Sequence, residues 1–309
     1  MLNKTIRVLN FDDSVARQGR LLSGYNAEVV DLRDIASRAR FWMNAKTKKE
    51  IAARIASSSK GAVTFFGSGD FHHLSSILIN SISEPVTVIN IDQHPDWSTF
   101  PKKLCCGSWV TETLKNDLVK KVLLLGMYSE SEVSFSSQTG NYSALENDRV
   151  EIYPWRQCPS KVFFRKIPRN KSIKTEARGI FTKIYWNELK EKKLTEFLHG
   201  VLKSFPTKSV YVSIDKDCLG KKFSLTNWQE GELSLDDLFL MLGVIKQEMN
   251  IIGVDVTGDY SAGVLKGAIK NIVSKFNHPK NFSAGGVSES EITRINENTN
   301  LEIMKILNS

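Results

Sequence analysis

The stretch "VINIDQHPDW" (88–97) joins an apolar run to three polar side chains spaced two residues apart. Its first half is rich in β-branched residues, which is typical of a buried strand. Asp92, His94 and Asp96 follow at once. Residues i, i+2 and i+4 of an extended chain point the same way, so these side chains can converge if the extended conformation persists beyond the strand.

Two further apolar runs end in a similar way. The segment "VYVSIDKDCLG" places Asp215 and Asp217 two residues apart at a strand end, and "FFGSGDFHHLSS" turns through glycines to His72 and His73. Ligands of open α/β sheets bind beyond the carboxyl ends of the strands. We therefore expect the polar side chains of all three segments to gather at one edge of a sheet.

Each of these segments alone is a weak signal, because a strand-end Asp often forms a turn. Together they deliver four Asp and at least two His to one place. Crowded carboxylates repel one another and are pushed towards protonation unless cations bind. Four ionised Asp match the charge of two divalent ions, and mixed oxygen and imidazole ligands suit manganese or a similar metal.

Alternating strand and helix patterns predict an α/β fold. Seven apolar runs rich in Val, Ile and Phe are strand candidates: 5–11, 61–67, 86–92, 121–127, 150–155, 209–215 and 250–256. Four stretches are helix candidates: 194–205, 234–249 with a capping box at its start, about 262–276 and about 292–307. Such alternation implies a mostly parallel sheet covered by helices on both faces, a three-layer α/β/α arrangement. No linker or repeat divides the chain, so we expect residues 1–309 to form a single domain.

The composition, 41% hydrophobic and 25% charged over 309 residues, is ordinary for a globular protein. No apolar run is long enough to span a bilayer, and the first residues lack the apolar core of a signal peptide. The four cysteines show neither a disulfide framework nor a C-x-x-C spacing. We therefore expect a cytoplasmic protein without a membrane partner.

Most of the net charge of +8 lies in one window, 161–183, which holds eight basic residues and one acid. This window is either a flap that attracts an acidic ligand or, the interpretation that we favour, a solvated surface segment. No helix-turn-helix, zinc-finger or RNP pattern accompanies the charge, so nucleic acid is not an expected partner. A second stretch, 129–148, is rich in Ser, Asn, Gln and Gly and predicts a long surface loop.

At this point the sequence resembles the ureohydrolase family, which includes arginase, agmatinase and formimidoylglutamase. In that family a G-G-D-H, a D-A-H-x-D and an S-x-D-x-D segment supply the ligands of two manganese ions. Here the corresponding segments are "SGDFHHL", "DQHPD" and "SIDKD". The resemblance spans the whole chain in length, strand order and motif order. It implies an arginase/deacetylase-like fold, a small-molecule substrate and, commonly for the family, a homo-oligomer.

The resemblance also implies a role for six side chains. Two carboxylates bridge the metal ions, and one His and one Asp complete each ion. The corresponding residues are Asp92 and Asp215 as bridges, His72 with Asp96 for one ion, and His94 with Asp217 for the other. An ungapped alignment places His72, rather than the adjacent His73, at the position of the family histidine.

Two further candidates are catalytic residues by the same resemblance. Asp255 is the best match to a carboxylate that holds the substrate guanidinium, with Asp259 as a competitor; the alternative is a strand-end residue paired with a neighbouring base. Many family members carry an H-G segment near the substrate, where this chain has Cys106 and Gly107. The thiol of Cys106 either stands in for that imidazole or is a small buried apolar group.

These features predict a binuclear manganese hydrolase that cleaves a C–N bond of a guanidine, an amidine or a related linear amide. A hydroxide that bridges the metals attacks the carbon, and Asp96 passes a proton to the departing amine. One alternative is a deacetylase-like amidohydrolase with a single zinc and a His pair. The other is a metal-binding module of the same fold without catalytic activity.

Overall fold

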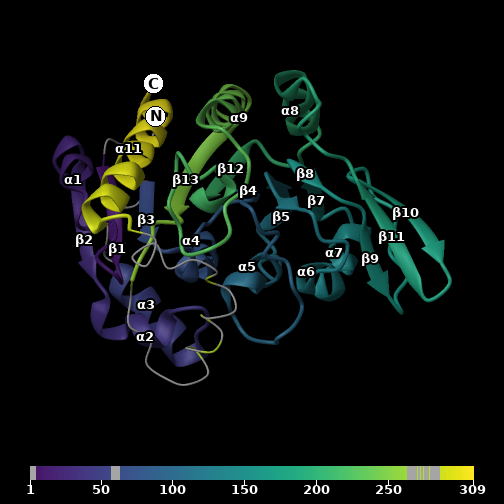
Figure 1. The fold of residues 1–309 in the computed structure, drawn as a ribbon, viewed down its shortest axis with the longest axis horizontal. Coiled ribbons are helices and arrows are strands. Elements are labelled where there is room, and N and C mark those ends of the chain that lie inside the picture. The colour runs from purple at the N-terminus through teal and green to yellow at the C-terminus, as the bar shows by residue number, and fades with distance from the viewer. Residues whose placement is uncertain are drawn as a thin grey trace.

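Eight parallel strands form the central sheet of the chain (Figure 1). The structure is a computed structural model that describes residues 5–56, 63–262, 270, 272, 274, 278 and 286–309. All seven pairings in the sheet are parallel. In spatial order the strands are β2 (Asn26–Asp31), β1 (Thr5–Asn10), β3 (Val63–Gly67), β13 (Asn250–Thr257), β12 (Ser209–Asp215), β4 (Val86–Ile91), β5 (Val119–Leu125) and β7 (Val150–Tyr153).

Helices cover both faces of this sheet, which confirms the predicted three-layer α/β/α fold. Neighbouring strand residues point to opposite faces, so Val88 belongs to one buried apolar cluster and Ile89 to the other. The cluster of Val88 includes residues of α2 (Ala36–Ala39), α3 (Ala45–Ile55), α4 (Ser75–Ile79), α5 (Trp109–Thr113) and α7 (Tyr142–Glu146). The cluster of Ile89 includes residues of α1 (Gly19–Gly24), α8 (Leu194–Lys203), α9 (Leu235–Glu248) and α11 (Glu289–Asn308).

The predicted helices at 194–205, 234–249 and 292–307 correspond to α8, α9 and α11. At the start of α9, the Ser234 side chain accepts a hydrogen bond from the Asp237 backbone N–H at 3.1 Å, and the Asp237 carboxylate accepts from the Ser234 N–H at 3.1 Å. This is the predicted capping box. The predicted helix at about 262–276 lies mostly outside the described residues.

The basic window forms most of a small antiparallel sheet at the surface, in agreement with its interpretation as a solvated surface segment. This sheet lies beyond β7, at the end of the molecule opposite β2 (Figure 1). Its inward residues Val162, Ile173 and Ile184 are buried, whereas most of the charged residues between them are exposed or half-buried. The strands, in order, are β10 (Ile173–Arg178), β11 (Phe181–Trp186) and β9 (Ser160–Phe163).

The predicted loop at 129–148 contains two short helices, α6 (Phe135–Thr139) and α7. The side chain of Ser134 caps α6, and that of Asn141 caps α7. Two of the polar residues that suggested a loop therefore act as helix caps. Just outside this stretch, the short strands β6 (Tyr128–Ser129) and β8 (Arg156–Gln157) pair with each other.

Among the helices that the structure describes, none is long and apolar enough to cross a membrane.

Candidate metal centre

Three neighbouring parts of the sheet carry the candidate ligands at its carboxyl edge. The first segment is a 3₁₀ turn, Gly69–Leu74, after β3; the second follows β4; the third is the end of β12 with the turn Lys216–Cys218. β12 lies between β4 and β13, and β13 lies beside β3, so these chain segments end next to one another. They bring together all six predicted metal ligands: His72, Asp92, His94, Asp96, Asp215 and Asp217.

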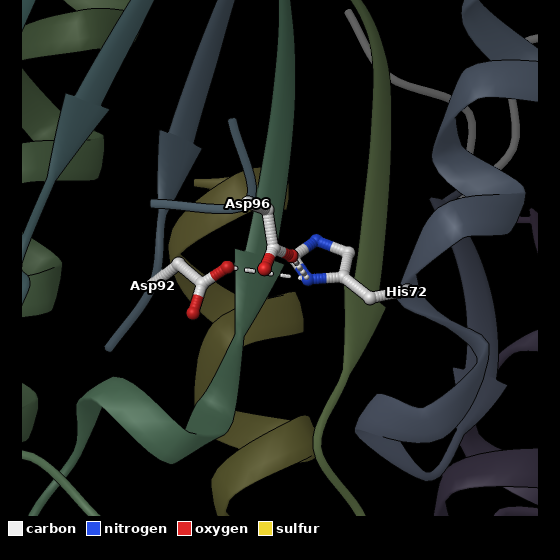
Figure 2. A group of neighbouring side chains, drawn as sticks. All are labelled: His72, Asp92 and Asp96. Carbon is white, nitrogen blue, oxygen red and sulfur yellow. Dashed lines mark ion pairs between the residues drawn. The ribbon is translucent and has the colours of Figure 1, made fainter. Parts of the chain in front are cut away.

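The inner group surrounds the ring of His72. Its Nδ1 lies 3.2 Å from Asp92 Oδ2, 3.2 Å from Asp96 Oδ2 and 3.4 Å from Asp215 Oδ2. Figure 2 shows how the carboxylates of Asp92 and Asp96 point at this nitrogen. All four side chains are buried. The inner group thus has one imidazole nitrogen and three carboxylates directed at a common point.

The outer group surrounds His94. Its Nδ1 lies 3.0 Å from Asp217 Oδ2 and 3.8 Å from Asp92 Oδ1. The His94 side chain is 36% exposed and lies edge-on to the ring of Trp228, with 5.4 Å between ring centroids. Asp92 therefore faces the inner group with one carboxylate oxygen and the outer group with the other, as a bridging carboxylate would.

A turn brings Asp92, His94 and Asp96 together. The extended conformation that would align them does not persist, because β4 ends at Ile91. The Asp92 carboxylate accepts a hydrogen bond from the His94 N–H at 2.7 Å, and Asp96 has a left-handed backbone with φ 45°. That conformation is uncommon for residues other than glycine. The indole N–H of Trp109 donates to Asp96 Oδ2 at 2.8 Å and fixes the direction of that carboxylate.

A buried hydrogen-bond chain behind the inner group orients His72. The Ser213 hydroxyl donates to Asp255 Oδ1 at 2.6 Å, so its oxygen is left to accept from His72 Nε2 at 2.9 Å. This network keeps a proton on Nε2, so Nδ1 is the nitrogen that can bind a metal. Burial opposes a charge on the ring, but the hydrogen bonds to Asp92 and Asp96 outweigh it and raise the pKa of His72 well above 6.5, so Nδ1 holds a proton until a metal replaces it. Metal-binding histidines are commonly held in one tautomer in this way.

The charges of the two groups are mutually dependent. Burial and the charge of Asp92 raise the pKa of Asp96 from 3.8 to about 6, and burial raises the pKa of Asp217 to about 6 against the effect of His94. Burial opposes a charge on His94, but the carboxylate of Asp217 outweighs it and raises the pKa of His94 to about 10. Protons thus offset the repulsion between the carboxylates. Divalent cations can serve the same purpose, and the donor set suits them.

His73 lies outside both groups. Its ring is buried, and burial together with the nearby charge of Lys270 lowers the pKa of His73 to about 3. The ring is therefore neutral at physiological pH. The choice between the adjacent histidines agrees with the ungapped alignment, because it is His72 that faces the carboxylates.

The structure corrects the prediction that Asp255 contacts a substrate. In the parallel register Asp255 pairs with Ser213, whereas Asp215 pairs with Thr257. Asp255 therefore lies two residues deeper in the sheet than the candidate centre, about 7 Å at 3.3 Å per residue. Its carboxylate is fully buried and accepts hydrogen bonds from Ser213 and, at 2.7 Å, from the Tyr211 hydroxyl.

The competitor Asp259 is also turned away from the candidate centre. Its Oδ1 accepts a hydrogen bond from Gln18 at 2.6 Å, and its Oδ2 lies 3.0 Å from Lys216 Nζ in a buried ion pair. Asp259 is thus paired with a buried base and is not free to bind a substrate.

A cavity of about 750 Å³ opens onto both groups. Cys106 lines it, as predicted for a residue near the substrate, and burial raises the pKa of its thiol well above 9.0. A neutral thiol cannot act as the base that an imidazole would provide. Aromatic rings form much of the rest of the wall: Phe41, Trp42, Phe100, Phe135 and Trp228.

Sequence reasoning missed several residues around the candidate centre. Ser213 could have been found, because it stands two residues before Asp215 and shares its face of β12. Trp228 could not, since it reaches the centre from a segment distant in sequence. Trp109 stands only 13 residues after Asp96, but no motif indicates that its indole donates to that carboxylate.

No protein-family model matches this sequence. A relative in Thermotoga maritima, named only as an uncharacterized protein, is 25% identical over 197 residues. The match covers 64% of this chain and 58% of the relative.

Solved structures give a more informative comparison. An arginase from Entamoeba histolytica, in complex with L-ornithine, has a TM-score of 0.57 at 10% identity and covers 100% of both chains. Proclavaminate amidino hydrolase from Streptomyces clavuligerus has a TM-score of 0.55 at 11% identity, covering 99% of this chain and 93% of its own. Arginase from Bacillus subtilis has a TM-score of 0.53 at 12% identity, covering 99% and 98%. By its structure, this chain therefore has the arginase fold of the ureohydrolases.

Proposed function

We propose that this protein is a binuclear metal-dependent hydrolase that cleaves a C–N bond of a small molecule, with manganese as the preferred metal. The observation that carries the proposal is the position of Asp92, whose two oxygens face His72 at 3.2 Å and His94 at 3.8 Å. The arginases and the amidino hydrolase of the same fold support the reaction class.

The six side chains would divide between two cations. His72 and Asp96 would complete the ligands of the inner cation, His94 and Asp217 those of the outer one, and Asp92 would contact both. The resemblance implies that Asp215, which lies 3.4 Å from His72 Nδ1, would also contact both. When bound, such cations supply a Lewis acid and lower the pKa of water, so that a nucleophile forms near neutral pH.

Residues of the chain supply the other parts of the proposed reaction. Asp96 lines the cavity, so its carboxylate can take up the proton that the attacking water releases. We assign to it the transfer of that proton to the departing amine nitrogen. Trp109 keeps the carboxylate directed inward.

The alternative with one zinc and a histidine pair has less support. It needs two imidazoles facing the same reaction centre, whereas His73 lies outside the cluster with its pKa lowered to about 3. The non-catalytic module shares the predicted metal sites, so only an activity measurement separates it from the hydrolase.

The test is metal analysis by mass spectrometry together with a screen for urea, ammonia and amine release after manganese loading. We expect about two metal ions per chain and turnover of at least one C–N compound. Asp215→Ala should lose both the metal and the turnover. Asp117→Ala, which changes an exposed Asp in the turn before β5, is the matched control and should change neither.

Full metal occupancy with no product from any guanidino, amidino or amide compound would favour the non-catalytic module. Unchanged metal content in Asp215→Ala would contradict the proposed centre itself.

A further inference from the structure

A guanidinium substrate needs a carboxylate that is free to pair with it in the cavity. Four Asp line the cavity, and all four belong to the candidate metal centre. Every Asp and Glu of this chain is among the residues that the structure describes, because the remaining positions carry none. Within the described cavity wall, no carboxylate is therefore left to pair with a guanidinium.

A further carboxylate, Asp70, follows the cavity-lining Gly69 and has three partners of its own. Its oxygens accept from Arg40 Nη1 at 2.7 Å and from Trp228 Nε1 at 3.0 Å, and Oδ1 lies 2.8 Å from His278 Nε2. Asp70 does not line the cavity. Oδ1 thus has two partners and Oδ2 is paired with the Arg40 guanidinium, so the charge of Asp70 is already balanced by a cation.

The end of β13, where the resemblance implied a substrate-holding carboxylate, presents a glycine instead. Gly258 has φ +94°, and a Cβ at this position would lie 2.4 Å from Asp215 Oδ1. No side chain fits there without displacing a candidate ligand. A single substitution therefore cannot restore a substrate-binding carboxylate at this point.

The charge of the cavity leads to the same conclusion. Four ionised Asp and two divalent cations sum to zero, so the remaining side chains decide the net charge. Among the described residues that line the cavity, Lys103 is the one Lys or Arg. Its ammonium lies over the ring of Trp42, 4.2 Å from the centroid. A guanidinium would meet a cation here and no counter-charge, whereas a carboxylate would be attracted.

The wall favours an apolar substrate group. The rings of Phe41, Trp42, Phe100, Phe135 and Trp228 line the cavity. Phe100 and Phe135 are 60% and 61% exposed, with their ring centroids 6.5 Å apart, so both have surface available for a ligand. Burial of apolar ligand surface against such rings is favourable.

We propose, on the basis of the proposed function, that the scissile group is an uncharged amide rather than a guanidinium. The substrate carries an aromatic or other apolar group against the cavity wall and an anionic group near Lys103, as an N-acylated amino acid does. Water adds its oxygen to the carbonyl carbon and the C–N bond breaks. The nitrogen gains protons, so amide plus water gives a carboxylate and an ammonium group.

The experiment compares N-acyl amino acids, with N-benzoylglycine as the lead probe, against arginine and agmatine on the manganese-loaded protein. Binding is measured by isothermal titration calorimetry, and turnover by amine and urea release. We expect N-benzoylglycine to bind more tightly than either guanidino compound. Its uncharged analogue N-benzoylglycinamide should bind more weakly than the acid.

Lys103 variants test the anionic contact. Lys103→Met should weaken binding of N-benzoylglycine about fivefold, the upper range for an exposed ion pair, and leave binding of N-benzoylglycinamide unchanged. Lys103→Arg should retain most of the affinity. Lys102→Met is the matched control, since Lys102 is an exposed neighbour outside the cavity wall, and it should have no effect.

The outcomes separate the two proposals. Turnover of arginine or agmatine in preference to the N-acyl amino acids would overturn the amide assignment and leave the hydrolase intact. Binding of N-benzoylglycine that depends on Lys103, without turnover of any compound, would support the substrate class and count against the hydrolase. Equal or weaker binding of N-acyl amino acids than of guanidino compounds would overturn the amide assignment.

Discussion

The inner and outer groups use the same residue types in different surroundings. His72 is 1% exposed, with three carboxylate oxygens within 3.4 Å of its Nδ1 and Ser213 behind its other nitrogen. His94 is 36% exposed and has two carboxylates near its Nδ1, one of them at 3.8 Å. Buried neighbours thus fix the inner group before any metal binds, and the outer group has fewer such constraints. We therefore expect the two groups to bind metal ions with unequal affinity, and the inner group to bind its ion more tightly.

The largest expected effect follows removal of the carboxylate that the two groups share. Asp92→Ala should abolish manganese binding at both groups and lower turnover by more than about a hundredfold, the upper range for residues that only orient a ligand. Metal analysis and the C–N hydrolysis screen measure this. Circular dichroism should show a folded chain. A folded Asp92→Ala protein with wild-type metal content would remove the basis of the comparison.

The two histidines should differ when each is removed. We expect His94→Ala to retain one manganese ion per chain, in the inner group, and His72→Ala to lose the tighter ion. Titration with manganese, followed by electron paramagnetic resonance, counts the ions and ranks their affinities. If His94→Ala loses both ions and His72→Ala keeps the tighter one, the ranking is reversed.

A smaller effect is expected from the hydrogen-bond chain behind the inner group. Ser213→Ala removes the acceptor of the His72 Nε2 proton, so the ring loses its fixed tautomer. Inner-site affinity should fall about 10- to 100-fold, with little change at the outer site. Ser209→Ala, at the start of the same strand, is the matched control. Equal weakening of both sites would indicate general disruption of β12.

The smallest expected effect is a pH dependence of the stability of the metal-free protein. The pKa of Asp217 is raised to about 6 and that of His94 to about 10, so the folded chain holds more protons than the unfolded chain. Stability therefore falls with rising pH, between about 4 and 6 for the Asp and between about 6.5 and 10 for the His.

Manganese replaces these protons, so it should raise the melting temperature more at pH 8.5 than at pH 5.5. At a manganese concentration one hundred times the Kd of a site, binding to that site raises the free energy of unfolding by about 2.7 kcal/mol. Thermal unfolding with and without manganese at the two pH values measures the difference. A larger shift at pH 5.5 would contradict the assignment of the protons to this cluster.

The features that sequence could predict are those encoded by local patterns. The strands β4 and β12 are continuous apolar runs that end in spaced polar residues, so both the strands and the candidate ligands were recognisable. β10 and β11 were not predicted, because their exposed charged residues conceal the alternation of buried positions. The turn at Asp96 was also missed, since a left-handed residue depends on contacts such as the one with Trp109.

Asp255 illustrates what a strand-end motif cannot specify. The sequence places an acid near the end of an apolar run, but register decides its depth. The pairing of Asp255 with Ser213 places it below the candidate centre, where it orients His72 through a hydroxyl. Only the alignment of neighbouring strands distinguishes a substrate contact from this supporting position.

The most direct test of the two-metal centre is the metal content of the purified protein after loading with manganese and removal of excess ions. Mass spectrometry should find about two manganese ions per chain in the wild type and almost none in Asp92→Ala. A wild-type chain that retains no manganese, or a variant that retains as much as the wild type, would contradict the account.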